Sequence, residues 1–207
     1  MIRVFIQARM SSSRFPGKVL APLKGKPVIK HLLDRVMQEI DPAQVVVLTS
    51  TKSSDDPLVS YLESENCSVF RGDLQNTLLR FQQALDKFPC ESFIRLCADS
   101  PLFDARLIPL AKLTLSQSHK ADLVTNVFPR TFPKGQSIEL VNTETFLKLN
   151  TSSLSENECE HVTTHFYNHA DRFTIINIEK DTSMILPELH SVVDTLSDLH
   201  AIEARLS

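Results

Sequence analysis

The sequence predicts an α/β protein with a mostly parallel sheet that is covered by helices on both faces. Short apolar runs, such as residues 2–6 and 45–48, alternate along the chain with segments whose apolar residues recur at helical spacing. This alternation is typical of strand–helix–strand units, in which parallel strands are joined by crossing helices. The chain has 207 residues, without an internal repeat or a low-complexity segment, so we expect a single domain over residues 1–207.

The elements are predicted in the following order. Helices are expected at residues 27–40, where Pro27 suits the first helical position, at 55–65, at 73–87 and 104–116 with Asp73 and Asp104 as caps, at 156–170, and from 197 onward. Strands are expected at residues 2–6, 45–48, 68–70, 93–97, 123–125, 137–141, 174–178 and 191–193. The chain after residue 122 is rich in strands and turns, which favours a mixed edge of the same sheet over a second domain.

Composition excludes several classes of protein. No apolar run approaches the roughly 20 residues that cross a bilayer, and the first residues are too short an apolar stretch for a signal peptide. The net charge of −3 argues against general nucleic-acid binding. The four cysteines form no C-x-x-C pair, which disfavours a disulfide framework or a zinc site and indicates a reducing, cytoplasmic environment.

Positive charge is concentrated at the start of the chain. Residues 1–30 contain seven of the 22 basic residues and no Asp or Glu. The loop predicted after the first strand, residues 7–20, offers three hydroxyls, two guanidiniums and one ammonium, which together suit a triphosphate. Gly17-Lys18 is followed by Val19 and lacks the earlier glycine of a Walker A loop, and no G-x-G-x-x-G fingerprint follows the strand. A solvated basic loop is the alternative interpretation.

The same loop carries a resemblance to a known family. Its residues 6–20, Ile-Gln-Ala-Arg-Met-Ser-Ser-Ser-Arg-Phe-Pro-Gly-Lys-Val-Leu, resemble the opening of the cytidylyltransferase-like proteins of spore coat polysaccharide biosynthesis. They are similar, more distantly, to the synthetases that make CMP-3-deoxy-octulosonate and CMP-sialic acid. The resemblance implies a Rossmann-like α/β/α sandwich of the nucleotide-diphospho-sugar transferase type. Ser11 departs from the glycine that is usual in the family.

The resemblance also implies which residues bind the nucleotide. Later matches are Leu48-Thr49-Ser50, near the nucleoside, and residues 69–73, near the base; a turn with a helix cap is the alternative for Arg71 and Asp73. The implied nucleotide-binding residues are Gln7, Ala8, Arg9, Ser12, Ser13, Arg14, Lys18, Thr49, Ser50, Arg71 and Asp73. Arg9, Arg14, Lys18 and Asp99 are the candidate catalytic residues.

Two aspartates are the candidate ligands of Mg²⁺. Asp99 follows a predicted central strand in the segment Ala98-Asp99-Ser100-Pro101, and Asp194 lies in the segment Val193-Asp194-Thr195. In the family that the chain resembles, the counterparts coordinate a divalent cation, and Mg²⁺ prefers one or two carboxylates together with phosphate oxygens and water. A helix cap is the alternative for either Asp.

The acceptor is expected on the side formed by residues 122–180, which is also the candidate dimerisation side. The resemblance places Asn126, Gly135, Glu139 and His161 there. His161, His165 and His169 recur every four residues, but the segment does not read H-E-x-x-H and shows no matching carboxylate, so a transition-metal site is disfavoured.

These residues and the family resemblance together predict a nucleotidyltransferase, and the resemblance implies CTP as the donor and a role in surface polysaccharide biosynthesis. The enzyme would transfer a nucleoside monophosphate, with CTP as the expected donor, to a sugar-like acceptor and release pyrophosphate; neither nucleic acid nor membrane is an expected partner, and a homodimer is possible on the family pattern. One alternative is a glycosyltransferase of related fold, although its Asp-x-Asp motif is absent. The other is a nucleotide-binding protein without catalysis.

Overall fold

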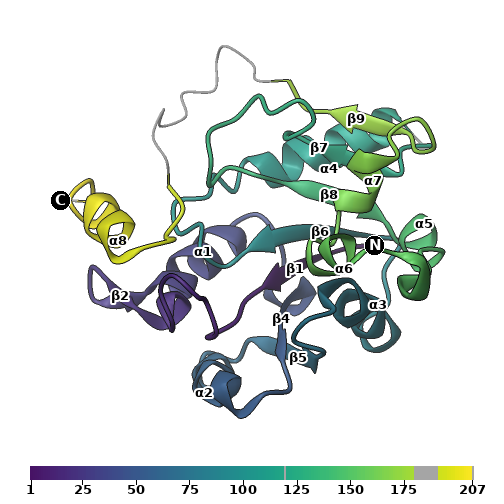
Figure 1. Ribbon diagram of the computed structural model, residues 1–207. Helices are drawn as coiled ribbons and strands as arrows, with labels where there is room; N and C mark the ends of the chain where they lie inside the picture. Colours follow the sequence, from purple (N-terminus) through teal and green to yellow (C-terminus); the bar gives the residue numbers. More distant parts are fainter. Residues whose placement is uncertain (119, 180–190, 207) are drawn as a thin grey trace.

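A seven-stranded sheet forms the centre of the computed structural model, which describes residues 1–118, 120–179 and 191–206 (Figure 1). Its strands are β1 (Ile2–Gln7), β4 (Val45–Ser50), β5 (Ser68–Gly72), β6 (Ser92–Cys97), β7 (Leu123–Thr125), β8 (Glu139–Asn142) and β9 (Ile175–Asn177). Their order across the sheet is β5-β4-β1-β6-β8-β7-β9. Only β8 runs antiparallel to its neighbours, β6 and β7, and the remaining pairs are parallel. The predicted mostly parallel mixed sheet is therefore confirmed.

Helices cover both faces of this sheet. The α-helices are α1 (Val28–Val36), α2 (Asp56–Ser64), α3 (Thr77–Lys87), α4 (Leu107–Gln117), α5 (Thr143–Leu147), α6 (Glu156–Glu160), α7 (Thr164–Asn168) and α8 (Leu196–Glu203). In β1, Val4 and Ile6 belong to the core cluster that includes residues of α1, α2 and α4, whereas Phe5 belongs to the cluster on the opposite face, which includes residues of α3, α5 and α7. Alternation along one strand thus fills two cores, as expected for a strand that is buried on both sides.

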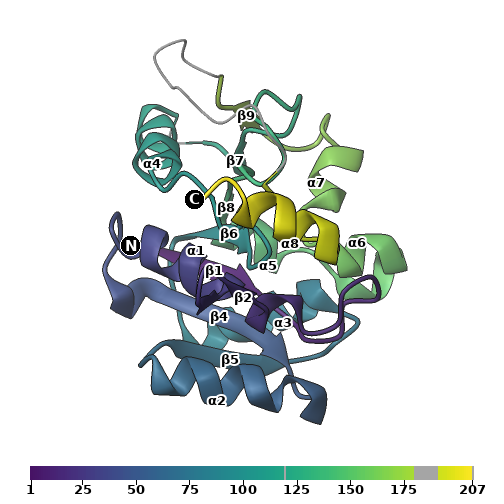
Figure 2. The same cartoon turned by 90° about the vertical axis from the view of Figure 1, so that its left-hand side faces the viewer.

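The first loop and the end of the chain meet beside a small hairpin. Strands β2 (Pro22–Leu23) and β3 (Lys26–Pro27) form this hairpin, and α8 lies next to it (Figures 1 and 2). Leu23 of the hairpin packs with Leu199 and Ile202 of α8 in a third apolar cluster. Thr195 caps α8 in a capping box with Asp198. This packing fixes the segment just before α8 close to the first loop.

Several predicted elements differ from the structure. The helix expected from Asp104 begins at Leu107, with Arg106 as its cap, because the Asp104 carboxylate bonds Arg106 instead. The helix expected over residues 156–170 is two short helices, α6 and α7, separated by a turn. The helix expected from Asp73 begins at Thr77, with Asn76 as its cap, because the Asp73 carboxylate instead accepts bonds from the backbone of Gln75 and Asn76 in a tight turn. Residues 191–193 form no strand, although the Val193 amide donates to the Asp99 carbonyl at 2.8 Å.

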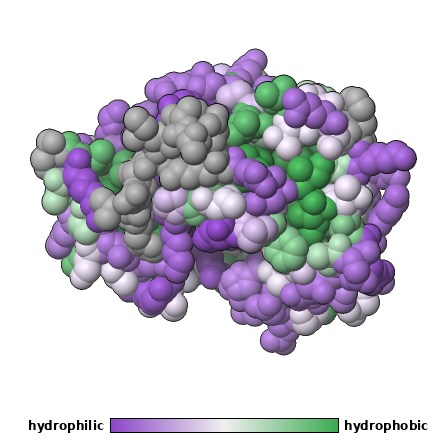
Figure 3. Space-filling view, turned by 90° about the horizontal axis from the view of Figure 1, so that it is seen from above, coloured by the Kyte–Doolittle hydropathy of each residue, from purple (hydrophilic) through white to green (hydrophobic). Residues whose placement is uncertain are grey.

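The surface carries few large apolar side chains. Within the described ranges, the exposed ones are Met1, Leu113, Phe128, Leu147 and Leu196, which lie on separate parts of the chain. Figure 3 shows a largely hydrophilic face with an apolar strip at one side. None of the helices in the described ranges combines the length and apolar character that would span a bilayer. Self-association through residues 122–180 stays a prediction.

Candidate active site

Two cavities open at the edge of the sheet where β1 and β6 end. The first, of about 310 Å³, is called the loop cavity because the first loop forms much of its wall. The second, of about 240 Å³, is called the sheet cavity and extends toward β8. Arg95, Cys97, Asp99 and Asp194 line both. Ligands of open α/β sheets bind beyond the carboxyl ends of the strands, and two cavities that share lining residues there can hold two reactants side by side.

The first loop forms a closed turn at the rim of the loop cavity. The Gly17 amide donates to the Met10 carbonyl at 2.8 Å, and Gly17 adopts a φ of 76°, a conformation that favours glycine. Seven loop residues that were predicted to bind the nucleotide line this cavity: Gln7, Ala8, Arg9, Ser12, Ser13, Arg14 and Lys18. The loop therefore presents its cations and hydroxyls to one space.

A buried carboxylate holds this loop in place. Asp55 is fully buried and accepts one hydrogen bond from the Met10 amide at 2.8 Å. Its second oxygen accepts three more, from the Thr49 hydroxyl and from the amide and hydroxyl of Ser50. Burial alone would raise the pKa of Asp55, but the bonds from Ser50, Met10 and Thr49 outweigh it and lower the pKa below the ordinary value. Asp55 thus fastens the first loop to the end of β4.

The two aspartates predicted to bind metal face a common point, which a lysine occupies. The Lys18 ammonium lies 2.7 Å from Asp99 Oδ2 and 3.0 Å from Asp194 Oδ1. Arg14 reaches the same Asp194 oxygen at 3.0 Å. Asp99 follows β6 and Asp194 precedes α8, and the Val193–Asp99 backbone bond ties the two segments together. The fold has thus brought together carboxylates that are far apart in the sequence.

Arg80 of α3 adds a cation that the sequence analysis did not select. Its side chain lines the loop cavity although the residue is only 2% exposed. One of its nitrogens donates to the Asp73 carbonyl at 2.7 Å, and Nε has no hydrogen-bond partner among the described residues. Burial, reinforced by Arg9, lowers the pKa of Arg80 to about 10. A Cβ at Gly72 would come within 2.7 Å of Arg80 Cγ, so the glycine that ends β5 makes room for this side chain.

A buried ionic network joins the two cavities. Glu139, the first residue of β8, pairs with Arg95 of β6 and accepts hydrogen bonds from Thr163 at 2.7 Å and Tyr167 at 2.6 Å. Arg95 also donates to the Gln7 side chain at 3.1 Å. Burial would raise the pKa of Glu139, but the Arg95 charge and the hydroxyls of Tyr167 and Thr163 lower it below its usual value. The carboxylate is therefore ionised and fixed in orientation.

Several residues that were predicted to bind the nucleotide lie outside both cavities. Thr49 and Ser50 are fully buried with their hydroxyls on Asp55. Arg71 donates to the Ser50 and Lys52 carbonyls and pairs with Asp56 at 2.7 Å. Asp73 closes the turn before α3. The structure gives these four side chains structural contacts around the site, and their direct contact with a nucleotide stays a prediction.

The predicted acceptor residues divide among three places. Gly135 and Glu139 line the sheet cavity, as expected for that side of the sheet. Asn126 is fully buried and bonds the Gln136 carbonyl and the Ile138 amide, so it shapes the turn and does not reach the cavity. His161 lines the loop cavity instead, next to Glu160, which pairs with Arg9 at 3.2 Å. The break between α6 and α7 causes this placement, because the chain turns at His161.

Comparisons with known proteins identify the family of this chain. Residues 3–186 match the model of the cytidylyltransferase family. The chain belongs to that family. It is 30% identical over 208 residues to the spore coat polysaccharide biosynthesis protein SpsF of Bacillus subtilis (strain 168), covering 98% of this chain and 85% of the relative.

Solved structures extend the comparison to the fold. A cytidylyltransferase from Leptospira borgpetersenii serovar Hardjo-bovis (strain JB197) superposes with a TM-score of 0.90 at 26% identity, covering 98% of this chain and 85% of the other. The synthetase of CMP-2-keto-3-deoxy-manno-octonic acid, solved with CTP, superposes with a TM-score of 0.73 at 19% identity over 99% of this chain and 98% of the other. The cytidylyltransferase therefore has the Rossmann-like nucleotidyltransferase fold that the sequence predicted.

Proposed function

We propose that this protein transfers CMP from CTP to a hydroxyl of an anionic, sugar-like acceptor and releases pyrophosphate, in the synthesis of a surface polysaccharide. The observation that carries the proposal is the pair of cavities that meet at Asp99 and Asp194, one lined by cations and hydroxyls and the other reaching into the sheet. Membership of the cytidylyltransferase family supports the reaction class and the choice of CTP.

The loop cavity suits the triphosphate. Arg9, Arg14, Lys18 and Arg80 surround it with four cations, and Ser12 and Ser13 add hydroxyls. Guanidiniums and ammonium groups stabilise the charge that accumulates on a departing pyrophosphate, and a preformed array does so without reorganisation during the reaction. The Arg80 side chain is preformed in this sense, because it packs against Gly72 and donates a hydrogen bond to the Asp73 carbonyl.

The carboxylates of Asp99 and Asp194 fit Mg²⁺. The two carboxylates converge on one point, which the Lys18 ammonium occupies. Because both carboxylates are negatively charged, this point favours a cation. Carboxylate oxygens beside phosphate oxygens are the ligands that Mg²⁺ prefers. We propose that these two residues hold the ion, which would supply charge neutralisation to the phosphates when bound. Lys18 would then pair with phosphate oxygens.

The sheet cavity suits an acceptor that carries negative charge. Arg130 and Lys134 line it in addition to Arg95, and Ser137 adds a hydroxyl that accepts from Arg130 at 3.1 Å. Glu139 is occupied by Arg95, Thr163 and Tyr167, so its negative charge is already balanced. The remaining cations match a carboxylate or phosphate on the acceptor.

The reaction itself is an in-line displacement at phosphorus. An acceptor hydroxyl attacks the α-phosphorus of CTP, a new oxygen–phosphorus bond forms, and the bond from the α-phosphorus to the bridging oxygen of pyrophosphate breaks. The hydroxyl proton leaves to solvent, and no side chain is assigned as its base. Cys97, which lines both cavities, takes no part as a nucleophile, because burial raises the pKa of its thiol to about 11. Positioning and electrostatics supply the acceleration.

The test is release of pyrophosphate with Mg²⁺, using CTP, UTP, ATP and GTP against a panel of acidic sugars and phosphorylated polyols. We expect release with CTP and an anionic acceptor, and loss of turnover in folded Lys18→Ala and Asp99→Asn. Lys120→Ala and Asp86→Asn are the matched controls, because both residues are exposed and line neither cavity. Release of a nucleoside diphosphate from a nucleotide-sugar would indicate a glycosyltransferase instead, and near-full activity of either site variant would refute its role.

A further inference from the structure

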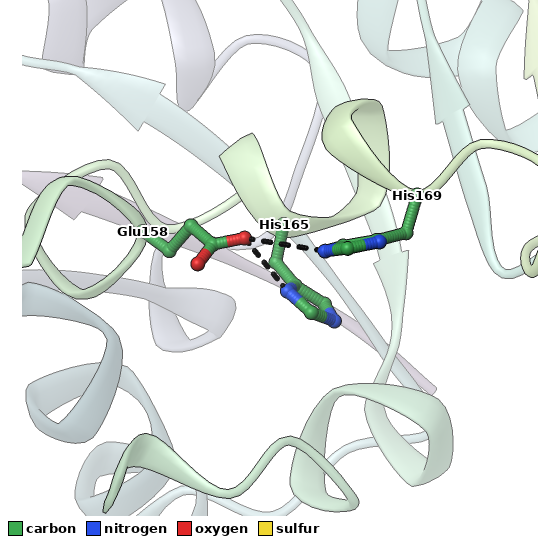
Figure 4. A group of neighbouring side chains, drawn as sticks. All are labelled: Glu158, His165 and His169. Atoms are coloured by element: carbon green, nitrogen blue, oxygen red, sulfur yellow. Dashed lines mark hydrogen bonds and ion pairs between the residues drawn. The ribbon is translucent and has the colours of Figure 1, made fainter. Parts of the chain in front are cut away.

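A carboxylate and two imidazoles converge at a place that lines neither cavity. Glu158 lies on α6, His165 on α7, and His169 directly after α7 (Figure 4). His165 Nδ1 lies 2.9 Å from Glu158 Oε1, and His169 Nε2 lies 3.7 Å from the same oxygen. The two imidazole rings are 4.4 Å apart between centroids. One potential ligand atom from each of the three residues lies within 4.8 Å of the others.

The break between α6 and α7 creates this cluster. In a continuous helix over residues 156–170, Glu158 and His165 would lie about two turns apart along the helix axis. The turn at His161–Thr163 instead folds α7 back against α6, so that the Glu158 carboxylate meets both imidazoles. The carboxylate partner that the histidine spacing lacked in the sequence is therefore supplied by the fold.

The separations of both imidazoles from the Glu158 carboxylate are close to those around a small divalent ion. Bonds from Zn²⁺ to imidazole nitrogen or carboxylate oxygen are about 2.0–2.1 Å long, so neighbouring ligand atoms of a tetrahedral site lie roughly 3.3 Å apart. The two separations from Glu158 Oε1, 2.9 and 3.7 Å, lie on either side of that value. Imidazole nitrogen with one carboxylate favours Zn²⁺ and its transition-metal neighbours over Mg²⁺, which prefers oxygen.

We propose that Glu158, His165 and His169 form a binding site for a divalent transition-metal ion, with Zn²⁺ as the expected occupant and water completing its coordination. The carboxylate is already oriented for this role. Its other oxygen accepts bonds from the Ser155 amide at 3.1 Å and the Ser155 hydroxyl at 2.8 Å. Such outer contacts fix ligands in metal sites and contribute to affinity.

The ion would act on the shape of the active site, not on the chemistry. It would bind α6 to α7 across the turn that carries His161, in the loop cavity, and Thr163, which donates to Glu139. Binding of the ion would therefore fix the positions of His161, in the wall of the loop cavity, and of Thr163, which donates to the buried Glu139 carboxylate. The site itself stands apart from the proposed function, because none of its three ligands contacts the space expected to hold the substrates.

Direct binding of Zn²⁺ tests the proposal. We would titrate the full chain with Zn²⁺ by calorimetry, in excess Mg²⁺ so that Mg²⁺ competes with Zn²⁺ for Asp99 and Asp194. The titration would be repeated with Co²⁺, whose visible absorption reports coordination geometry. The proposal expects saturable binding of a single Zn²⁺ per chain and a tetrahedral or five-coordinate Co²⁺ spectrum. Absence of saturable Zn²⁺ binding would overturn it and leave a hydrogen-bonded carboxylate–imidazole cluster.

Variants distinguish this site from other ligands in the chain. His169 is partly exposed, so His169→Ala should remain folded, and His200→Ala on α8 is the matched control because it removes an exposed imidazole elsewhere. Losing an outer contact weakens metal sites by about 10–100-fold, so losing a ligand should weaken Zn²⁺ binding by roughly 100-fold or more. Glu158→Gln should do the same. Unchanged Zn²⁺ affinity in folded His169→Ala would overturn the assignment, as would an equal loss in His200→Ala.

Discussion

Replacing Asp55 by Asn tests whether this buried carboxylate holds the first loop. One carboxylate oxygen accepts from the Met10 amide and the other from the Ser50 amide, together with two hydroxyls. An Asn side chain has a single acceptor oxygen, and its NH₂ group cannot accept from a backbone amide. In either orientation, the amide of Met10 or of Ser50 loses its partner.

The expected loss of stability follows from the hydrogen bonds that the substitution removes. A buried donor without a partner costs about 1–3 kcal/mol, and the remaining bonds change from charge-assisted to neutral at a cost of about 1 kcal/mol. We therefore expect Asp55→Asn to lower the free energy of unfolding by about 2–4 kcal/mol, measured by urea denaturation. The folded variant should also bind CTP more weakly, because the Met10 bond anchors the loop that lines the loop cavity.

Asp56→Asn is the matched control, because the neighbouring carboxylate is exposed and pairs only at the surface, with Arg71. Such pairs contribute about 0–1 kcal/mol. The pKa of Asp55 is lowered in the folded protein, so its ionisation stabilises the fold above the ordinary Asp pKa of about 3.9, and this contribution is lost as the pH falls through the folded value. The difference between wild type and Asp55→Asn should shrink accordingly. A loss no larger than that of Asp56→Asn at pH 7 would refute the reasoning.

Two further predictions concern the sheet cavity. Glu139→Gln leaves the buried Arg95 charge without its ionic partner and should lower the free energy of unfolding by about 3–5 kcal/mol at pH 7. Glu144→Gln, which removes an exposed carboxylate, should leave the free energy of unfolding nearly unchanged. Because the pKa of Glu139 is also lowered, its contribution to the free energy of unfolding should be present above the ordinary Glu pKa of about 4.3 and be lost at lower pH. Urea denaturation at several pH values measures both effects. Equal effects of the two variants would contradict the prediction. Gly135→Ala places a Cβ 2.2 Å from Ser191 Oγ at a φ of 96°, so we expect a cost of about 1–3 kcal/mol and a raised KM for the acceptor, with KM for CTP little changed. Steady-state kinetics with each substrate varied in turn would expose an error if the KM for CTP rose instead.

Local sequence patterns predicted the parts of the site that one segment specifies alone. The first loop carries its own cations, and Asp99 directly follows a buried strand, so both could be placed at the edge of the sheet before any coordinates. The pairing of Asp99 with Asp194 came from a family resemblance and depends on α8 packing against the hairpin. No pattern in either segment specifies that contact.

Some contacts around the site depend on tertiary structure. Thr49 and Ser50 end a strand at the correct edge, but Asp55 turns back and takes their hydroxyls, which a strand pattern does not reveal. Arg80 was not among the predicted site residues, and its burial depends on the space beside Gly72. That glycine at the end of a strand, eight residues before an arginine on the facing helix, was the available signal.

The antiparallel direction of β8 has a consequence for how this protein can change over evolution. Because β8 begins where β6 ends, the segment between β7 and β8 opens onto the sheet cavity and carries Arg130, Lys134 and Gly135. The strands and loop that line the loop cavity come mainly from the first hundred residues, with Glu160, His161 and Asp194 as the later contributions. If the cavities hold the acceptor and the nucleotide as we propose, insertions or substitutions in residues 127–137 would diversify acceptor specificity and leave the residues around the nucleotide unchanged, provided that Glu139 keeps its register opposite Arg95.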